Sequence, residues 1–408
     1  MAAFDSGGSS PAALGKRLQK TSEIEEGFMS VDTQDMVKDL IMTINQTISE
    51  LAHLNILVVG KSGVGKSTLI NSIFRGHLAE TGLGRPVTQE IRKIEKKGFP
   101  LTIYDTPGFE LSGGQQDRVK DSILNLISNG YAKEDVNQAI HCIWYCINVG
   151  GNRTFDAAEL TWLRSFSKEN RHFQVPIIVV LTQAIPKSKA MEMKRLVEKE
   201  NLDIVQVVPL LAKEVNFDDD YVAKPYGLDR LIEVMSQCLP EELDDTLQNM
   251  QIGSLEAKKK KARQIVAKAV KAAFGEGFVP VPFADAAVLV PIQIGMIAKI
   301  TATFGLEVNR SFLMAFLTST IGTTGATVLG RTVVANLMKM VPSFGTAVGG
   351  VISGSTAAVI TTALGESYIF LMEMLYRGEI SSDDLNSKKV RDLLTGFFKE
   401  ALRRGKGK

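Results

Sequence analysis

The stretch from Asn55 to Phe74 constrains the fold more than any other part of the sequence. An apolar run, Ile56–Val59, leads into the glycine-rich segment Gly60–Ser67, and an apolar pattern with helical spacing follows. Glycine, four residues, then glycine-lysine-serine between a strand and a helix is the pattern of a phosphate-binding loop, the P-loop. Its backbone N–H groups and the positive end of the helix dipole attract phosphate oxygens. The stretch therefore predicts a nucleotide-binding α/β domain.

The residue types in this loop indicate separate roles. We expect Lys66 to reach the β- and γ-phosphates and the Ser67 hydroxyl to bind Mg²⁺. The predicted phosphate contacts in this segment are Gly60, Lys61, Ser62, Gly63, Val64, Gly65, Lys66, Ser67 and Thr68.

Two later segments complete a triphosphate site. Asp105 follows the strand-like run Leu101–Tyr104, and a carboxylate at a strand end can hold Mg²⁺. Gly108 can sense the γ-phosphate through its N–H, and Thr88, in the intervening loop, can bind Mg²⁺ only when that phosphate is present. The sequence thus predicts metal ligands at Ser67, Thr88 and Asp105 and catalytic roles for Lys66, Thr88 and Gly108.

These motifs resemble those of Era-like GTPases of the translation-factor-related class, and the wording of Gly60–Ser67 is similar to septins and immunity-associated GTPases. The resemblance covers about residues 52–240. It implies a Ras-like sheet, GTP with Mg²⁺ as cofactors, slow hydrolysis and a switching or self-assembling protein, including a nucleotide-dependent homodimer.

Two positions depart from the family pattern. The base-recognition motif is replaced by Thr182-Gln183-Ala184-Ile185, and Ile185 cannot supply the carboxylate that pairs with guanine. Thr182 and Gln183 can still cover the base, and Ala212-Lys213 resembles the last base-contacting loop, so GTP is favoured and ATP remains an alternative. Phe109 stands where Ras-type enzymes carry a water-orienting glutamine, which predicts slow hydrolysis or help from another group such as Gln115, Gln116 or Arg85.

Alternating apolar segments predict a mostly parallel sheet with helices on both faces. The spacing of apolar residues in Val31–Leu51 predicts an amphipathic helix, which we expect to pack on the nucleotide domain. The expected strands are Ile91–Lys96, Leu101–Tyr104, Ala139–Ile147, Ile177–Leu181 and Ile204–Val208, and the expected helices are Gln116–Asn129, Ala157–Ser167, Met191–Lys199 and Leu228–Cys238.

The composition changes after residue 240 and predicts an apolar helical domain. The basic run Lys258, Lys259, Lys260 and Lys261 suits either an anionic membrane surface or a solvated helix. Phe312–Gly330 and Met340–Gly365 lack charged residues and are long enough to cross a bilayer, but Thr, Ser and Gly dilute them, so a soluble bundle stays open. We expect a flexible tail (1–30), the lead-in helix (31–51), the nucleotide domain (52–240), a linker (241–256), the apolar helical domain (257–380) and a C-terminal helix with a basic tail (381–408).

Charge and cysteine content narrow the setting. A net charge of +2 over 408 residues gives no general signal for nucleic acid, and the three cysteines form no disulfide framework. We expect a cytoplasmic protein, either soluble or held at a membrane. The alternative to a membrane-linked switch is a soluble ATP- or GTP-dependent scaffold or assembly factor whose helical domain docks a protein partner.

Overall fold

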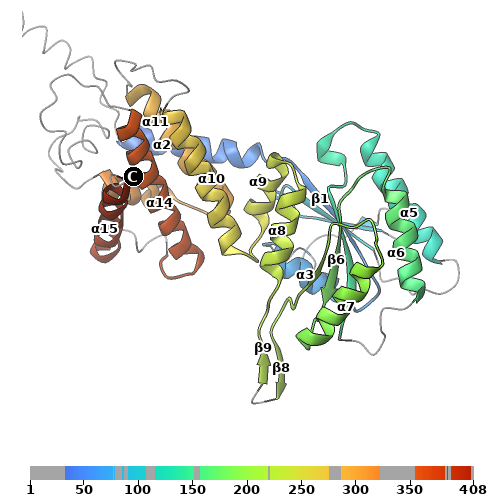
Figure 1. The fold of residues 1–408 in the computed structure, drawn as a ribbon. Helices are drawn as coiled ribbons and strands as arrows, with labels where there is room; N and C mark the ends of the chain where they lie inside the picture. Colours follow the sequence, from blue (N-terminus) through green and yellow to red (C-terminus); the bar gives the residue numbers. More distant parts are fainter. Residues whose placement is uncertain are drawn as a thin grey trace, which may run out of the picture.

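The computed structural model describes residues 33–76, 78, 85–86, 91–106, 115–150, 157–218, 221–274, 286–321, 354–381, 384 and 387–405. Figure 1 shows two halves side by side: a sheet covered by helices, and a group of helices that includes both the first described helix and the last. The predicted architecture, a Ras-like α/β domain with a mostly parallel sheet followed by a helical domain, is confirmed.

The central sheet has the strand order β2-β3-β4-β1-β5-β6-β7. The strands β4, β1, β5, β6 and β7 run parallel, whereas β2 and β3 pair antiparallel at one edge. Every residue of β1 and β6 is buried, as expected for strands covered on both faces. The strand bounds are Leu54–Val59 (β1), Arg85–Pro86 (β2), Arg92–Glu95 (β3), Leu101–Asp105 (β4), Cys142–Asn148 (β5), Ile177–Thr182 (β6) and Gln206–Pro209 (β7).

Two apolar cores lie on the two faces of this sheet. The helices α3, α8 and α9 cover one face, and α5, α6 and α7 cover the other. A separate antiparallel hairpin, β8 and β9, projects away from the sheet (Figure 1). The bounds are Lys66–Ile73 (α3), Gln115–Tyr131 (α5), Ala157–Asn170 (α6), Lys187–Lys199 (α7), Val215–Asp218 (β8), Tyr221–Ala223 (β9), Leu228–Cys238 (α8) and Glu241–Met250 (α9).

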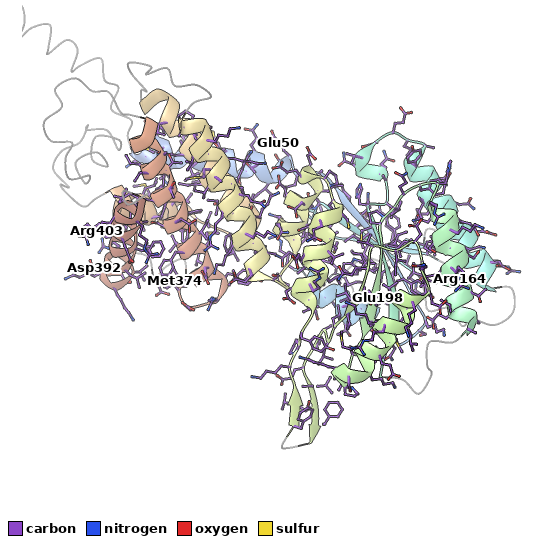
Figure 2. All side chains as sticks on the ribbon, viewed as in Figure 1. Glu50, Arg164, Glu198, Met374, Asp392 and Arg403 are labelled. Atoms are coloured by element: carbon purple, nitrogen blue, oxygen red, sulfur yellow. The ribbon has the colours of Figure 1, made fainter. Side chains whose placement is uncertain are left out.

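The helical domain has a core of its own, and within the described residues six helices contribute to it. Side chains fill the space between these helices, as around Met374 (Figure 2). Arg164 and Glu198, also labelled there, belong to α6 and α7 of the sheet domain. The bounds are Thr33–Ser49 (α2), Leu255–Phe274 (α10), Ala286–Phe304 (α11), Arg310–Ile321 (α12), Gly354–Tyr376 (α14) and Lys388–Gly405 (α15).

The position of the lead-in helix differs from the expectation. Met36, Val37, Leu40 and Ile44 belong to the core of the helical domain, and α2 packs on α11 and α12 rather than on the nucleotide domain. Its apolar stripe was predictable from spacing, but the identity of its partner depends on contacts with residues more than 200 positions away.

The segment expected to be a linker is also different. Within the expected linker (241–256), residues Glu241–Met250 form α9, whose Leu243, Leu247 and Met250 are buried in the core on one face of the sheet. Gln251 then pairs with Phe74 in an antiparallel bridge. The chain therefore leaves the sheet domain through a packed helix, which fixes where the helical domain begins.

Candidate functional site

The P-loop follows β1, and its tight turn requires glycine at positions with a positive φ angle. Gly63 and Gly65 have φ angles of 74° and 94°. A Cβ atom added at Gly60 would lie 2.6 Å from the carbonyl oxygen of Cys146, so the loop approaches β5 too closely for a side chain. Gly65 caps the start of α3, which points the N-terminus of that helix into the loop.

Lys66 lies inside the loop, as predicted. It is buried, and its ammonium group donates hydrogen bonds to the carbonyl oxygens of Gly60 (2.9 Å) and Lys61 (3.2 Å). Ser62 and Ser67 are exposed at the same loop, whereas Val64 is buried beneath it. The ammonium is thus held where the phosphates of a nucleotide are expected, with the Ser67 hydroxyl free to face solvent.

Asp105 ends β4, the strand next to β1, beside the P-loop. Burial raises the pKa of its carboxyl group to about 6, although Lys66 and Arg92 act in the opposite direction. Its buried Oδ1 has no hydrogen-bond partner within the described part of the chain. A buried carboxylate oxygen without a hydrogen-bond partner, on the strand beside the phosphate-binding loop, fits Mg²⁺ held with Ser67, because oxygen atoms are the ligands that this ion prefers.

Thr182 is buried beside the P-loop, and its expected contact with a base stays a prediction. Its buried hydroxyl donates to the carbonyl oxygens of Val64 (2.5 Å) and Ile147 (3.1 Å), so it fastens the P-loop to the neighbouring strand ends. Gln183 is exposed, and its side-chain amide donates to the carbonyl oxygen of Gly63 at 3.2 Å. The residues that replace the recognition motif therefore support the P-loop. Of Thr182 and Gln183, only Gln183 is exposed to solvent.

The other predicted base contact follows the adjacent strand. Ala212 is half-buried and packs on the core, and Lys213 is exposed just beyond β7, which pairs with β6. Both therefore lie at the same edge of the sheet as Gln183. Thr88, Gly108 and Phe109, together with the side chains of Arg85, Gln115 and Gln116, lie outside the described residues, so their assignments remain predictions.

The structure adds one residue at the loop that the sequence analysis missed. Glu159, in the first turn of α6, accepts an ion pair from the Lys61 ammonium at 2.9 Å. Only fold contact brings these residues together, and an acidic residue in a first helical turn is too common to single out.

A polar cluster joins the far end of α3 to the helical domain. The Arg75 guanidinium donates to the carbonyl oxygen of Gly305, just past α11, at 2.5 Å and to Asn249 Oδ1 in α9 at 2.6 Å. The Asn249 amide in turn donates to the carbonyl oxygen of Ala302 at 2.6 Å. A single short helix thus connects the P-loop lysine with the last turn of α11.

The basic run does not form the exposed membrane-binding surface that the sequence suggested. Lys258 is completely buried, and its ammonium group donates to the carbonyl oxygens of Gln248 and Thr303. Burial, with Arg75 nearby, lowers the pKa of Lys258 well below its ordinary value. Lys259 pairs with Glu256 and Glu373, and Lys261 pairs with Asp244 and Asp245. Lys260 alone of the four is exposed, so contact with an anionic membrane through Lys258–Lys261 is wrong.

The predicted bilayer-length segments are only partly described, because residues 322–353 lie outside the described ranges. Among the described residues, one helix, Ala357–Tyr376 within α14, is long and apolar enough to span a membrane, with a mean hydropathy of 1.3. More than half of it (56%) is buried inside the protein, where α14 packs on α10, α11 and α15. Its apolar character is explained by its place in the helical core.

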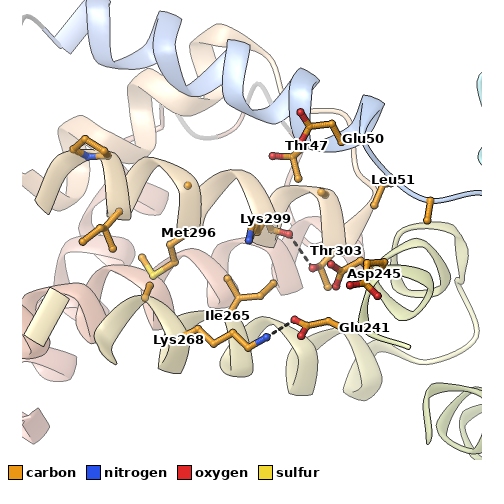
Figure 3. Close-up of a pocket in the computed structure, with 17 residues that line it drawn as sticks. Thr47, Glu50, Leu51, Glu241, Asp245, Ile265, Lys268, Met296, Lys299 and Thr303 are labelled. Atoms are coloured by element: carbon orange, nitrogen blue, oxygen red, sulfur yellow. Dashed lines mark hydrogen bonds and ion pairs between the residues drawn. The ribbon is translucent and has the colours of Figure 1, made fainter. Parts of the chain in front are cut away.

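A cavity of about 480 Å³ lies where the two halves meet, between α2, α9, α10 and α11. Figure 3 shows Ile265, Met296 and the ion pair of Lys268 with Glu241 among the residues that line it. A Cβ atom added at Gly295 would meet nothing within 4 Å, which leaves α11 open over this space. The cavity is separate from the P-loop site.

Comparison with known proteins supports the division of the chain. Residues 55–208 match the family model described as 50S ribosome-binding GTPase, and residues 242–399 match a domain of unknown function (DUF697). The sheet half thus has the Ras-like fold of P-loop GTPases and is similar in sequence to a GTPase family.

The curated relatives include septins. Neuronal-specific septin-3 of Danio rerio is 30% identical over 237 residues, which cover 51% of this chain and 61% of the relative. Septin-12 of Homo sapiens is 41% identical over 92 residues, 19% of this chain and 25% of the relative. The chain spans about three fifths of the length of the septin-3 that it matches.

Two solved structures were among the matches. Toc33 from Arabidopsis thaliana, a dimerization-deficient mutant, is 17% identical with a TM-score of 0.30, covering 55% of this chain and 96% of that one. Era in complex with MgGDPNP and nucleotides of 16S ribosomal RNA is 17% identical with a TM-score of 0.30, covering 57% and 70%. Placement among Era-like GTPases specifically stays a prediction.

Proposed function

We propose that this protein binds GTP with Mg²⁺, hydrolyses it slowly, and acts as a switch whose nucleotide state is transmitted to the helical domain. The observation that carries the proposal is the paired arrangement of Lys66 inside the P-loop and, on the neighbouring strand, a buried Asp105 oxygen that has no hydrogen-bond partner among the described residues. Mg²⁺ would supply neutralisation of the phosphate charge. In this role the chain's own groups bind and orient: the loop N–H groups hold the phosphates, Lys66 compensates their charge and Ser67 and Asp105 hold the metal.

We favour GTP over ATP on the family match, and we assign the open side of the base pocket to Gln183 and Lys213. Neither side chain offers the carboxylate of the usual motif, so discrimination is expected to be weaker than in GTPases that carry it. Slow turnover is expected because Phe109 cannot orient water.

Transmission to the helical domain is supported by the polar cluster of Arg75, Asn249 and Gly305. Because α3 begins at Lys66 and Arg75 follows its end, a shift of the P-loop helix changes contacts at the last turn of α11. A packed junction with partly buried charged hydrogen bonds favours discrete arrangements over continuous drift.

The direct test measures the affinities of the full chain for GTP, GDP and ATP with and without Mg²⁺. We expect both guanine nucleotides to bind more tightly than ATP and GTP to depend on Mg²⁺. Lys66→Ala should abolish binding, because Lys61, the other lysine of the loop, is paired with Glu159 and does not replace the charge of Lys66. A folded Lys66→Ala protein with unchanged affinity for GTP would refute the P-loop assignment.

A second candidate function is a nucleotide-dependent scaffold that self-associates or docks a protein partner. It is favoured by the projecting hairpin, where Phe217, Tyr221 and Val222 are exposed on an isolated pair of strands, an arrangement that is marginal alone in water. Size-exclusion chromatography with light scattering in GDP and in a GTP analogue tests this: a larger species with the analogue supports it, and a monomer in both removes the homodimer.

A further inference from the structure

The side chain of Lys61, a residue of the P-loop, points toward Glu159 on α6 and not into the loop. Its ammonium nitrogen lies 2.9 Å from Glu159 Oε2 on α6, and the two side chains are only 16% and 5% exposed. An ion pair this poorly solvated is less screened by water and salt than one at the surface. The ion pair between Lys61 and Glu159 therefore helps to hold the P-loop against α6.

Glu159 is itself fixed by a rigid apolar base. The Tyr145 hydroxyl of β5 donates to Glu159 Oε1 at 3.4 Å, and the Tyr145 ring stacks on Trp162 at 5.5 Å between centroids. Trp162 continues the stack onto Phe166 at 5.1 Å. Since β5 and α6 belong to one buried core, the carboxylate has little freedom to follow a moving partner.

The backbone of Lys61 carries this constraint to the phosphate site. Its carbonyl oxygen accepts a hydrogen bond from Lys66, the residue expected to contact the phosphates. The orientation of the Lys61 peptide thus helps to place the Lys66 ammonium, and the Lys61 side chain, pulled toward α6, helps to set that orientation.

We propose that Glu159 is a positioning residue for nucleotide binding, which acts through Lys61 to hold the P-loop in its phosphate-binding shape. The inference rests on the proposed GTP-binding function. In this proposal Lys66 neutralises the charge of the phosphates, because the charge of Lys61 is already balanced by Glu159. The effect concerns GDP and GTP alike, since the loop cradles phosphates that both nucleotides carry.

The test compares the affinities of single and double variants for GDP and for a GTP analogue. Glu159→Gln and Lys61→Met should each weaken both nucleotides about tenfold, the scale of one charged hydrogen bond. The double variant should be no weaker than either single variant, because the two residues act as one unit. Lys61→Arg should retain binding, since it keeps the pair.

Glu169→Gln is the matched control. Glu169 lies on the same helix, but its ion pair, 2.9 Å long, is with Lys120 of α5 and not with the P-loop. It should leave both affinities unchanged. Unfolding temperatures are recorded for every variant, and Lys61→Met still reports if Glu159→Gln fails to fold.

Two results would overturn the proposal. Tighter binding in Glu159→Gln with weaker binding in Lys61→Met would show that Lys61 is a direct phosphate ligand that Glu159 competes for. Lower unfolding temperatures with unchanged affinities would show a merely structural pair. A wild-type protein that binds neither nucleotide would instead remove the proposed function, and the inference with it.

Discussion

Asp105 shows how one buried residue links the site to pH. Because burial raises the pKa of its carboxyl group from 3.8 to about 6, the group is protonated in a range where most aspartates are charged. Only the carboxylate binds Mg²⁺ well. We therefore expect Mg²⁺-dependent affinity for GTP to be constant above pH 7 and to fall about tenfold as the pH is lowered to 5. Titration of affinity against pH, with Asp105→Asn as the variant that lacks the step, measures this.

The same shift predicts the stability of the nucleotide-free protein. The folded state holds the Asp105 proton more tightly than the unfolded chain does, so this group's contribution is lost as pH rises from about 4 to about 6. A shift from 3.8 to about 6 corresponds to roughly 3 kcal/mol in the free energy of unfolding. Urea unfolding of wild type and Asp105→Asn across this range should differ in that direction; parallel curves would contradict it.

Thr88 is the residue that we expect to distinguish bound GTP from bound GDP. Thr88→Ala should weaken binding of a GTP analogue and spare GDP, because its proposed Mg²⁺ contact exists only with the γ-phosphate. The measurement is the ratio of the two affinities in the variant and in wild type. Equal losses for both nucleotides would make this loop structural.

Among the elements, the end of α11 is the most sensitive point of the junction. Gly305 has a φ of 64°, and a Cβ atom there would lie 2.2 Å from the carbonyl oxygen of Asn249. Gly305→Ala should therefore lower the free energy of unfolding by about 3 kcal/mol, from the left-handed backbone and the displaced Arg75 contact together. Urea unfolding followed by circular dichroism measures the loss.

Gly295→Ala on the same helix is the control. Its Cβ atom would meet nothing within 4 Å, and alanine suits a helix interior better than glycine, so we expect a gain of up to about 1 kcal/mol. Equal losses in the two variants would contradict the specific role of the Arg75–Gly305 contact.

Elements with a continuous local signal were predictable from the sequence. The apolar runs of β1 and β6 and the helical spacing of α8 lie where they were expected, because each pattern depends on neighbouring residues alone. The predicted start of β5, Ala139, was too early, because the strand begins at Cys142. The partner of α2 and the role of α9 were missed because both depend on contacts between distant segments.

The site followed the same rule. The P-loop and Asp105 were predictable because their chemistry requires a fixed spacing of residue types. Lys258 was not: four successive lysines indicate a solvated surface, and only the carbonyl oxygens of Gln248 and Thr303, brought together by the fold, explain a buried ammonium group. The carboxylate of Glu159 was hidden for the same reason.

At the scale of the whole molecule, the two halves share a junction built from charged and polar groups. The cluster of Arg75, Asn249 and Gly305 lies on one route through it, and the buried Lys258 lies on another, between the last residues of α9 and α11. Because these contacts connect helices of both halves, we expect the nucleotide state and the conformation of the helical domain to be thermodynamically linked.

Hydrogen–deuterium exchange of the full chain with no nucleotide, with GDP and with a GTP analogue tests that link most directly. We expect the analogue, relative to GDP, to change exchange in the last turns of α9 and α11 as well as at the P-loop, and we expect Lys66→Ala to abolish every difference. Identical exchange throughout residues 241–405 in the GDP-bound and analogue-bound protein, with the P-loop protected in both, would contradict it.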